Sequence, residues 1–311
     1  VQDDELRVNL FNRAHTGDHD FVPMTVNDLA GAGTSPHWSY DGCLVADLEG
    51  TPAGFATAGI EAERTDNVGR IGGPHVVPEM RRRGIGTALA RAAFTELTAR
   101  GRTIAHASAE EDSPTGYFLA SLGFTEVRRF SQMVRHLDGL PQDAGASTSV
   151  QVAAVEPTAE TIPMLVRLEN ESFKEHFNRP PETVAGFEDA ERNLARHGIV
   201  SHISVAYVDG TPVGFISYGH DPREISAVGR KLAGLWDIGV LKPWRKRGIA
   251  KRLMLDAMNH LRNEGMDEVD LNVDETNVTG ALHVYERLGF RVTRRSLSYR
   301  KDLGATPNEA K

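Results

Sequence analysis

A short basic run in the second half of the chain has the residue types and spacing of an anion-binding loop. Arg245–Ala250, read R-K-R-G-I-A, follows an apolar stretch around Ile238–Val240 and opens an amphipathic segment. The first N–H groups of a helix have no partners within the helix. With basic side chains and a glycine that permits close approach, they favour a bound diphosphate. Val76–Gly86 repeats the arrangement, so the sequence predicts two such loops.

Other interpretations of the two loops are weaker. The simplest is a solvated basic helix start. Neither loop extends to G-x-G-x-x-G, and the chain has no G-x-x-x-x-G-K-[ST] run, so other phosphate-binding motifs are not indicated. A net charge of −8, with no aromatic residues between the arginines, argues against nucleic acid as a partner.

A second group of residues suggests proton transfer. Asn277–Phe290 reads N-V-T-G-A-L-H-V-Y-E-R-L-G-F and is expected to contain a helix with Tyr285 at its centre. When an amine attacks a thioester, a thiolate leaves, and a nearby phenol can donate a hydrogen bond or a proton to it. The alternative for Tyr285 is simple packing against Ala281 and Leu288 on one helix face.

These two patterns together resemble the GNAT acetyltransferase superfamily. The loop fits its Q/R-x-x-G-x-G/A signature, and the later segment fits N-x-x-x-A-x-x-x-Y-x-x-x-G-F. The resemblance implies acetyl-CoA as cofactor, Tyr285 as the acid, Asn277 on the pantetheine arm, and the Val240 backbone beside the acetyl carbonyl. It implies cofactor contacts from Ile238, Val240, Arg245, Lys246, Arg247, Gly248, Ile249, Ala250 and Asn277, and in the first copy from Val76, Val77, Arg81, Arg82, Arg83, Gly84, Ile85 and Gly86.

Two such copies in one chain resemble the tandem GNAT type that includes mycothiol synthase. The similarity covers about residues 43–136 and 150–303. It implies an N-acetyltransferase that acts by direct transfer on a small-molecule primary amine, with the cysteinyl amine of a pseudodisaccharide thiol as one possible acceptor. Acceptor pockets vary on a constant fold, so other amines stay open. The alternative is a non-catalytic acyl-CoA-binding or sensing protein.

The first copy departs from the pattern at the positions that carry the chemistry. Counting back from Gly123, the position that matches Tyr285 is Leu119, and the position that matches Asn277 is Glu111. Tyr117 is two residues away and would face elsewhere on a helix. Leucine cannot donate a proton, so turnover is assigned to the second copy, and the first is expected to be catalytically impaired.

The general base is less clear from the sequence. Asp237 on the strand before the loop is the first candidate, with Glu175 and His176 as others, and a solvated surface group is the alternative for each. His15 and His19 have ligand-like spacing, but in a glycine-containing loop without a further partner they do not indicate a metal, and no metal site is predicted.

Internal repetition sets the expected organisation. Val45–Phe55 returns as Val205–Phe215, each reading as a hairpin, at an offset of about 160 residues that indicates duplicated domains. We expect a GNAT-like domain at 1–138, a linker at 139–149, a second domain at 150–303 and a polar tail at 304–311. Each domain should be a mixed α/β (α+β) layered fold with a central sheet flanked by helices.

The expected elements of the second domain are a strand at Val150–Val155, helices after Pro157 and near Thr183–Arg196, a helix at Ile249–Glu264, a strand at Glu268–Val273, a helix at Thr279–Leu288 and a strand near Arg291–Arg300. The first domain is expected to follow the same plan from Cys43 on, whereas the Gly-rich Phe11–Trp38 ahead of it is hard to assign.

Composition adds a few expectations. The 311 residues are 40% hydrophobic, which suits two ordinary cores. The lone cysteine, Cys43, excludes an internal disulfide and fits a reducing cytoplasm. No apolar run reaches the roughly 18 residues that span a bilayer, and no secretory signal is evident, so a cytoplasmic protein without membrane partners is expected. A monomer or a homodimer is compatible with these data.

Overall fold

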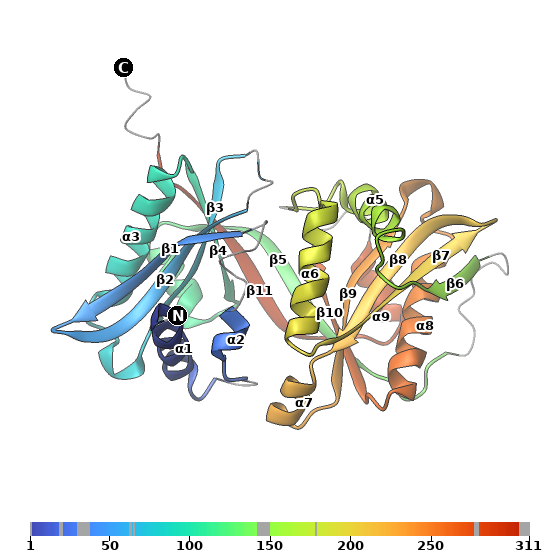
Figure 1. The fold of residues 1–311 in the computed structure, drawn as a ribbon, viewed down its shortest axis with the longest axis horizontal. Helices are drawn as coiled ribbons and strands as arrows, with labels where there is room; N and C mark the ends of the chain where they lie inside the picture. Colours follow the sequence, from blue (N-terminus) through green and yellow to red (C-terminus); the bar gives the residue numbers. More distant parts are fainter. Residues whose placement is uncertain are drawn as a thin grey trace, which may run out of the picture. The chain divides into compact units, whose positions relative to one another are not determined.

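The computed structural model describes residues 2–18, 21–29, 38–61, 64, 66–141, 150–177, 179–276 and 280–304 (Figure 1). The chain forms two compact units. The first unit comprises Val1–Arg129 and Ser296–Lys311, and the second comprises Phe130–Arg295. Among the described residues, no helix combines the length and the apolar character that crossing a bilayer requires.

The strands of the second unit form a mixed sheet, and helices connect them. Its elements are β6 (Val150–Ala154), α5 (Ile162–Phe173), α6 (Val184–Arg196), β7 (Val200–Val208), β8 (Thr211–His220), α7 (Pro222–Val228), β9 (Leu232–Val240), a 3-10 turn (Lys242–Trp244), α8 (Ile249–Asn263), β10 (Glu268–Asp274) and α9 (Ala281–Arg287). The strands β6 to β9 pair antiparallel in sequence order, and β9 pairs parallel with β10.

Alternation along β8 shows how this sheet is covered. Phe215 packs with Leu165 and Leu168 of α5, whereas the next residue, Ile216, packs with the α8 core. Because neighbouring strand residues face opposite sides, α5 and α8 must cover opposite faces of the sheet. On α8, the predicted stripe Ile249, Leu253, Ala257 and Leu261 is buried along its whole length.

The first unit repeats this plan. Its elements are α1 (Gln2–His15), α2 (Val26–Leu29), β1 (Trp38–Leu48), β2 (Thr51–Glu61), β3 (Val68–Val76), a 3-10 turn (Pro78–Met80), α3 (Ile85–Ala99), β4 (Ile104–Glu110) and α4 (Pro114–Ser121). Alternation on β2 places Phe55 with Leu10 of α1 and Ala56 with Leu89 of α3. Thus α1 and α3 cover opposite faces, as α5 and α8 do in the second unit.

Two long strands are each divided between the two units, with one part of the strand in each unit. β5 (Thr125–His136) contributes Phe130–His136 to the second unit, where these residues pair antiparallel with Asp274–Glu268 of β10. β11 (Arg291–Asp302) contributes Ser296–Asp302 to the first unit, where they pair with Glu110–Ile104 of β4. The compact units therefore differ from the predicted ranges 1–138 and 150–303. The last strand segment of each half of the sequence belongs to the compact unit formed by the other half.

The predicted fold class is confirmed, since both units are mixed α/β layers around a central sheet. The expected helices of the second unit are present, with Thr183 as the N-cap of α6 and Glu264 as the C-cap of α8. The sequence analysis did not predict α7. The proposed linker lies mostly outside the described residues, as do residues 305–311 of the tail.

Candidate functional site

The site begins where two parallel strands of the second unit separate. β9 and β10 pair only from Leu232 to Gly234 with Glu268 to Asp270, although β9 continues to Val240 and β10 to Asp274. Beyond Gly234, over the described length of both strands, the two do not pair with each other. Carboxyl ends of parallel strands are a usual place for ligands in open sheets, and here the separated edges leave room for an extended chain.

The predicted loop follows the end of β9 directly. A 3-10 turn ends at Arg245, which is extended, and Lys246 (φ +62°) and Gly248 (φ +78°) adopt left-handed conformations before α8 starts at Ile249. No side chain caps this helix. Its first N–H groups are therefore unsatisfied within the helix, and such groups, preceded by left-handed residues, are suited to bind an anion.

The side chain of Arg245 turns inward rather than toward this concavity. Its Nε donates to the Val240 carbonyl at 3.0 Å, and one terminal nitrogen donates to the Ser172 carbonyl of α5 at 2.9 Å. Arg245 thus ties the loop to the end of β9 and to the end of α5. Lys246 and Arg247 are exposed, and the Arg247 guanidinium lies 4.8 Å from the centre of the Trp244 ring.

The first unit has the same loop in the same conformation. Arg82 (φ +63°) and Gly84 (φ +80°) are left-handed, and α3, which starts at Ile85, has no side-chain cap. Arg81 donates from Nε to the Val76 carbonyl at 2.9 Å and from a terminal nitrogen to the Ala14 carbonyl of α1 at 2.6 Å. The two predicted loops therefore agree in backbone geometry and in the anchoring of their first arginine.

Tyr285 lies on α9, which follows β10. Its ring packs against the main core of the second unit and lies 6.1 Å from the Phe290 ring, centre to centre. Burial raises the pKa of its phenol to about 12. The group is therefore fully protonated at neutral pH and can serve as a hydrogen-bond or proton donor.

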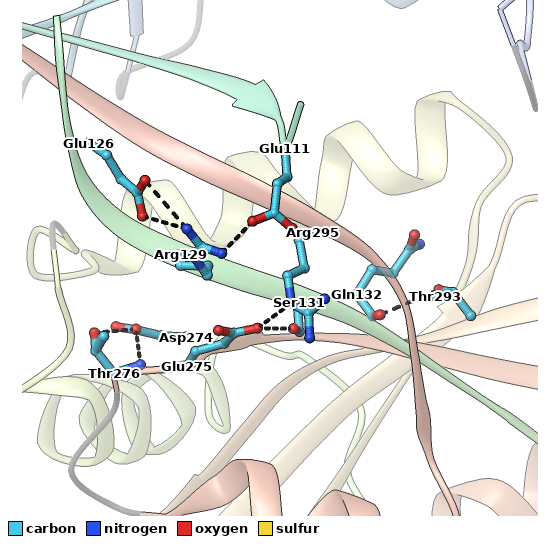
Figure 2. Close-up of polar contacts among 10 residues, drawn as sticks. All are labelled: Glu111, Glu126, Arg129, Ser131, Gln132, Asp274, Glu275, Thr276, Thr293 and Arg295. Carbon is cyan, nitrogen blue, oxygen red and sulfur yellow. Dashed lines mark hydrogen bonds and ion pairs between the residues drawn. The ribbon is translucent and has the colours of Figure 1, made fainter. Parts of the chain in front are cut away.

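Figure 2 shows the polar contacts at the end of β10, the strand that precedes α9. At the end of β10, Asp274 accepts hydrogen bonds from the Thr276 backbone N–H at 2.9 Å and from its hydroxyl at 2.7 Å. Glu275 accepts from the Ser131 hydroxyl and, at 2.9 Å, from Arg295 Nε. Asn277, the predicted pantetheine contact, follows immediately but lies outside the described residues.

Asp237 does not stand alone on β9. Its carboxylate accepts from Arg179 at 2.6 Å, and the other terminal nitrogen of Arg179 donates to Glu169 of α5 at 2.7 Å. Burial raises the pKa of the Glu169 carboxyl, although the Arg179 guanidinium opposes this. Burial opposes the charged form of Arg179, but its hydrogen bonds to the two carboxylates and their negative charge outweigh burial and raise the pKa of Arg179. The sequence analysis missed Glu169 and Arg179 because nothing local marks them.

The other two candidate bases differ in their surroundings. Glu175 pairs with Lys242 at 2.7 Å and with Arg245 at 3.4 Å, and the hydrogen bond from Lys242 leads the lowering of its pKa. A lowered pKa makes Glu175 a weaker base. His176 stacks edge-on against Phe173, with ring centres 5.6 Å apart.

An exposed aromatic residue lies next to Asp237. The β8–β9 register shifts between Ser217 and Tyr218, which leaves Trp236 as the extra residue of a bulge. Its indole covers Gly219 and Gly234, where an added Cβ would come within 2.7 Å and 2.2 Å of the ring. Trp236 is 40% exposed and gives the site a flat apolar surface.

In the first unit the corresponding positions cannot supply the same acid. Leu119 is only 2% exposed and belongs to the core, Glu111 is bound by Arg129 (Figure 2), and Tyr117 is 66% exposed. This unit has instead a histidine pair beside its loop strand. His75 Nδ1 lies 2.8 Å from His15 Nε2, and His15 Nδ1 lies 2.6 Å from the Asp18 carboxylate. His19, the other half of the spacing noted in the sequence, lies outside the described residues.

These features fit a cofactor that ends in a thioester and carries a diphosphate. The N-terminus of α8, which no side chain caps, and the left-handed Gly248 before it can receive the diphosphate. The separated edge of β9 can receive the extended arm. The contacts of individual residues stay predictions.

Comparison with known proteins agrees with this geometry. Residues 9–124 and 162–290 match the acetyltransferase (GNAT) family. A mycothiol acetyltransferase of Rhodococcus erythropolis (strain PR4) is 27% identical over 287 residues, which cover 88% of this chain and 87% of the relative. A mycothiol acetyltransferase of Gordonia bronchialis is 31% identical over 220 residues, covering 69% and 68%.

Solved structures show the same fold. A tandem GNAT protein from the clavulanic acid biosynthesis pathway aligns with a TM-score of 0.74 at 18% identity, over 97% of this chain and 95% of that one. A GCN5-related N-acetyltransferase from Sphaerobacter thermophilus aligns with a TM-score of 0.67 at 21% identity, over 95% and 91%. With most of both halves inside the family match, the chain belongs to the acetyltransferase (GNAT) family and is an acetyl-CoA-dependent N-acetyltransferase.

Proposed function

We propose that the second unit carries the activity and acetylates a small-molecule primary amine by direct transfer. One observation carries this proposal: of two equivalent positions, the second unit has a phenol, Tyr285, and the first has a core leucine, Leu119. Bound acetyl-CoA supplies the acetyl group as a thioester whose sulfur leaves as a thiolate. Tyr285 holds a proton on its phenol oxygen up to a pH of about 12 and can donate it toward that sulfur.

The acceptor amine must lose a proton, and Asp237 is the proposed base. Arg179 holds Asp237 and Glu169 together, so the carboxylate of Asp237 keeps one orientation while its side chain remains partly open to solvent. In this arrangement Glu169 and Arg179 are positioning residues. A carboxylate can take the proton directly or through one water molecule.

For the acceptor we propose the one that the resemblance to mycothiol synthase implies, the cysteinyl amine of a pseudodisaccharide thiol; the relatives' name, mycothiol acetyltransferase, is consistent with it. The exposed Trp236 beside Asp237 supports a sugar-bearing acceptor, because the apolar face of a sugar ring packs well on an aromatic ring. The check is a thiol-release assay with this acceptor and a panel of other amines, with the acetylated product identified by mass. Tight acetyl-CoA binding without product from any amine would favour a sensing protein instead.

The assignment of Tyr285 has its own test. Tyr285→Phe keeps the packing of the ring and removes only the hydroxyl, so kcat should fall roughly 10²-fold or more while acetyl-CoA affinity changes little. Tyr117→Phe, on the exposed tyrosine of the first unit, is the matched control and should leave kcat unchanged. An unaltered kcat for Tyr285→Phe would remove Tyr285 from the mechanism.

A second candidate function concerns the first unit. Its loop has the backbone geometry and arginine anchoring of the second loop, yet its acid position is Leu119. This combination supports a first unit that binds acetyl-CoA without turning it over.

A further inference from the structure

Three histidines and a glutamate of the second unit converge at the end of α8 that is remote from the loop. His202 lies on β7, His220 ends β8, His260 lies on α8 and Glu264 caps that helix. Strand register pairs His202 with Tyr218 and Val200 with His220. Because strand residues two apart face the same side, both strand histidines lie on the face that α8 covers. At 1.5 Å per residue, the cluster is roughly 20 Å from Gly248 along the helix.

The distances within this cluster suit a single small cation. His202 Nε2 lies 3.0 Å and His260 Nε2 lies 3.4 Å from one carboxylate oxygen of Glu264, and His220 Nδ1 lies 4.0 Å from the other. The candidate ligand atoms of His202, His260 and Glu264 all lie within 4.8 Å of one another. Around a tetrahedral ion with bonds of about 2.1 Å, ligand atoms are separated by roughly 3.4 Å. Small rotations of these side chains would therefore complete the geometry.

Two of the nitrogen atoms make no hydrogen bond to the part of the chain that the structure describes, although both lie near the Glu264 carboxylate. His202 Nε2 and His220 Nδ1 are buried and make no hydrogen bond. His202 Nε2 is close to Glu264 but is not aligned with it as a hydrogen bond would be. Buried polar atoms are normally satisfied, and two such atoms aimed at the same carboxylate indicate a missing ligand.

The third histidine is held in the orientation that metal ligands need. His260 Nδ1 lies 3.3 Å from the hydroxyl of Tyr218, which lies 3.4 Å from Ser204 Oγ and is only 1% exposed. A hydrogen bond at Nδ1 directs the other nitrogen, Nε2, toward Glu264. Metal-bound histidines usually have a partner of this kind on the opposite ring nitrogen.

The electrostatic surroundings also favour a cation. Cations are stabilised at the C-terminal end of a helix, where His260 and Glu264 lie. A pocket of about 40 Å³ lined by His202, His260, Glu156 and Glu191 adjoins the cluster, and this volume has room for a few water molecules beside an ion. Burial, and then Glu156, raise the pKa of Glu191, so this wall gains from a positive charge nearby.

We infer that His202, His220, His260 and Glu264 form a binding site for one divalent transition metal, with Zn²⁺ as the best match. Three imidazoles and one carboxylate in a compact group are donors that Zn²⁺ accepts in four-coordinate sites. The ion would fasten β7 and β8 to the C-terminal end of α8, the helix whose other end forms the cofactor loop. The site is structural and independent of the proposed acceptor.

The test uses the full chain without a histidine tag, stripped with a chelator and titrated with Co²⁺. We expect one Co²⁺ per chain, with the intense visible absorption of a four-coordinate ion that Zn²⁺ then displaces. His260→Ala and Glu264→Gln should each weaken Co²⁺ binding at least tenfold. Zn²⁺ should raise the thermal unfolding midpoint of the wild type but not that of these variants.

Two further variants make the result decisive. Tyr218→Phe keeps the ring packing and removes the hydroxyl that contacts His260 Nδ1 and Ser204 Oγ, so it should weaken Co²⁺ binding several-fold without unfolding the protein. His136→Ala removes a single histidine 3.3 Å from Glu268 and should bind Co²⁺ like the wild type. Absence of binding, or binding that His260→Ala and Glu264→Gln leave unchanged, would overturn the inference and leave only a histidine–glutamate ion-pair cluster.

Discussion

At the residue scale, the position of the first arginine in each loop suggests a contact with the diphosphate, but its side chain binds backbone carbonyls instead. Arg245 and Arg81 direct their donors to carbonyls of Val240 and Ser172, and of Val76 and Ala14. Their charge still lies beside the loop, but their hydrogen bonds shape the backbone. We therefore expect the diphosphate to be recognised by backbone N–H groups, with the exposed basic residues as additional charge.

His75 gives the first unit a pH dependence that can be measured. Burial, reinforced by His15, lowers the pKa of His75 from 6.5 to about 4. Between these values the unfolded chain binds the proton and the folded chain does not. The contribution of neutral His75 to the free energy of unfolding is therefore complete above pH 6.5 and is lost as the pH falls toward 4, by at most about 3.4 kcal/mol.

His75→Gln should remove part of this loss, because an amide does not titrate. His106, whose pKa burial also lowers to about 4, remains in the variant and retains the rest. The measurement is the free energy of urea unfolding at pH 7 and at pH 4.5. The exposed His136 supplies the control His136→Gln, which should keep the wild-type difference, and an identical difference in His75→Gln would contradict the prediction.

At the element scale, the two units share one succession of backbone conformations, with nearly equal dihedral angles. In each unit a strand ends, a 3-10 turn and two left-handed residues follow, and a helix starts. In neither unit does a side chain cap the helix. This similarity predicts two acetyl-CoA sites per chain, of which one supports turnover. Native mass spectrometry during a titration with acetyl-CoA would count them.

Glutamate variants separate the two sites. Gly248→Glu should lose one bound acetyl-CoA together with turnover, and Gly84→Glu should lose one while turnover remains, because a carboxylate at the helix start repels the diphosphate. Gly265→Glu is the matched control: Gly265 has φ +89° and open space at Cβ, so the backbone strain is similar, but it follows the far end of α8. A wild type that binds one acetyl-CoA would show that the first loop has no such function.

At the scale of the whole molecule, the exchanged strand segments decide which fragments can fold. Phe130–His136 provides the antiparallel partner of β10, and Met133 and Leu137, 0% and 1% exposed, belong to the core of the second unit. Burying two such side chains contributes about 3–6 kcal/mol, a large share of the stability of an ordinary domain. A fragment that starts at residue 150 lacks them.

We therefore expect fragment 130–295 to be more stable than fragment 150–303. Urea unfolding followed by circular dichroism would show a lower midpoint, or no cooperative transition, for fragment 150–303. Fragment 130–295 with Met133→Ala should fall between the two, since it keeps the strand but loses a buried side chain. Equal midpoints for the two fragments would mean that the β5 segment contributes little.

The local features of this protein were accessible from its sequence. The loops were predicted because glycine, basic residues and a helix start act within a few residues of one another. The helices near Ile162 and Ile249 were predicted because an apolar stripe at helical spacing is a short-range signal. The second copy of each feature strengthened the prediction.

Only the tertiary structure showed what depends on register and on contacts between distant residues. Arg179 lies between Glu169 and Asp237, and the arginine of each loop reaches the end of a helix about seventy residues earlier, at Ser172 or Ala14. His202, His220, His260 and Glu264 have no motif spacing, and they meet because β7 pairs with β8 in one register and α8 crosses that face. The strand exchange is equally invisible in the sequence, since an edge strand of suitable pattern can pair with either sheet. The sequence alone determined the short-range backbone geometry, and long-range packing decided which side chains share a site.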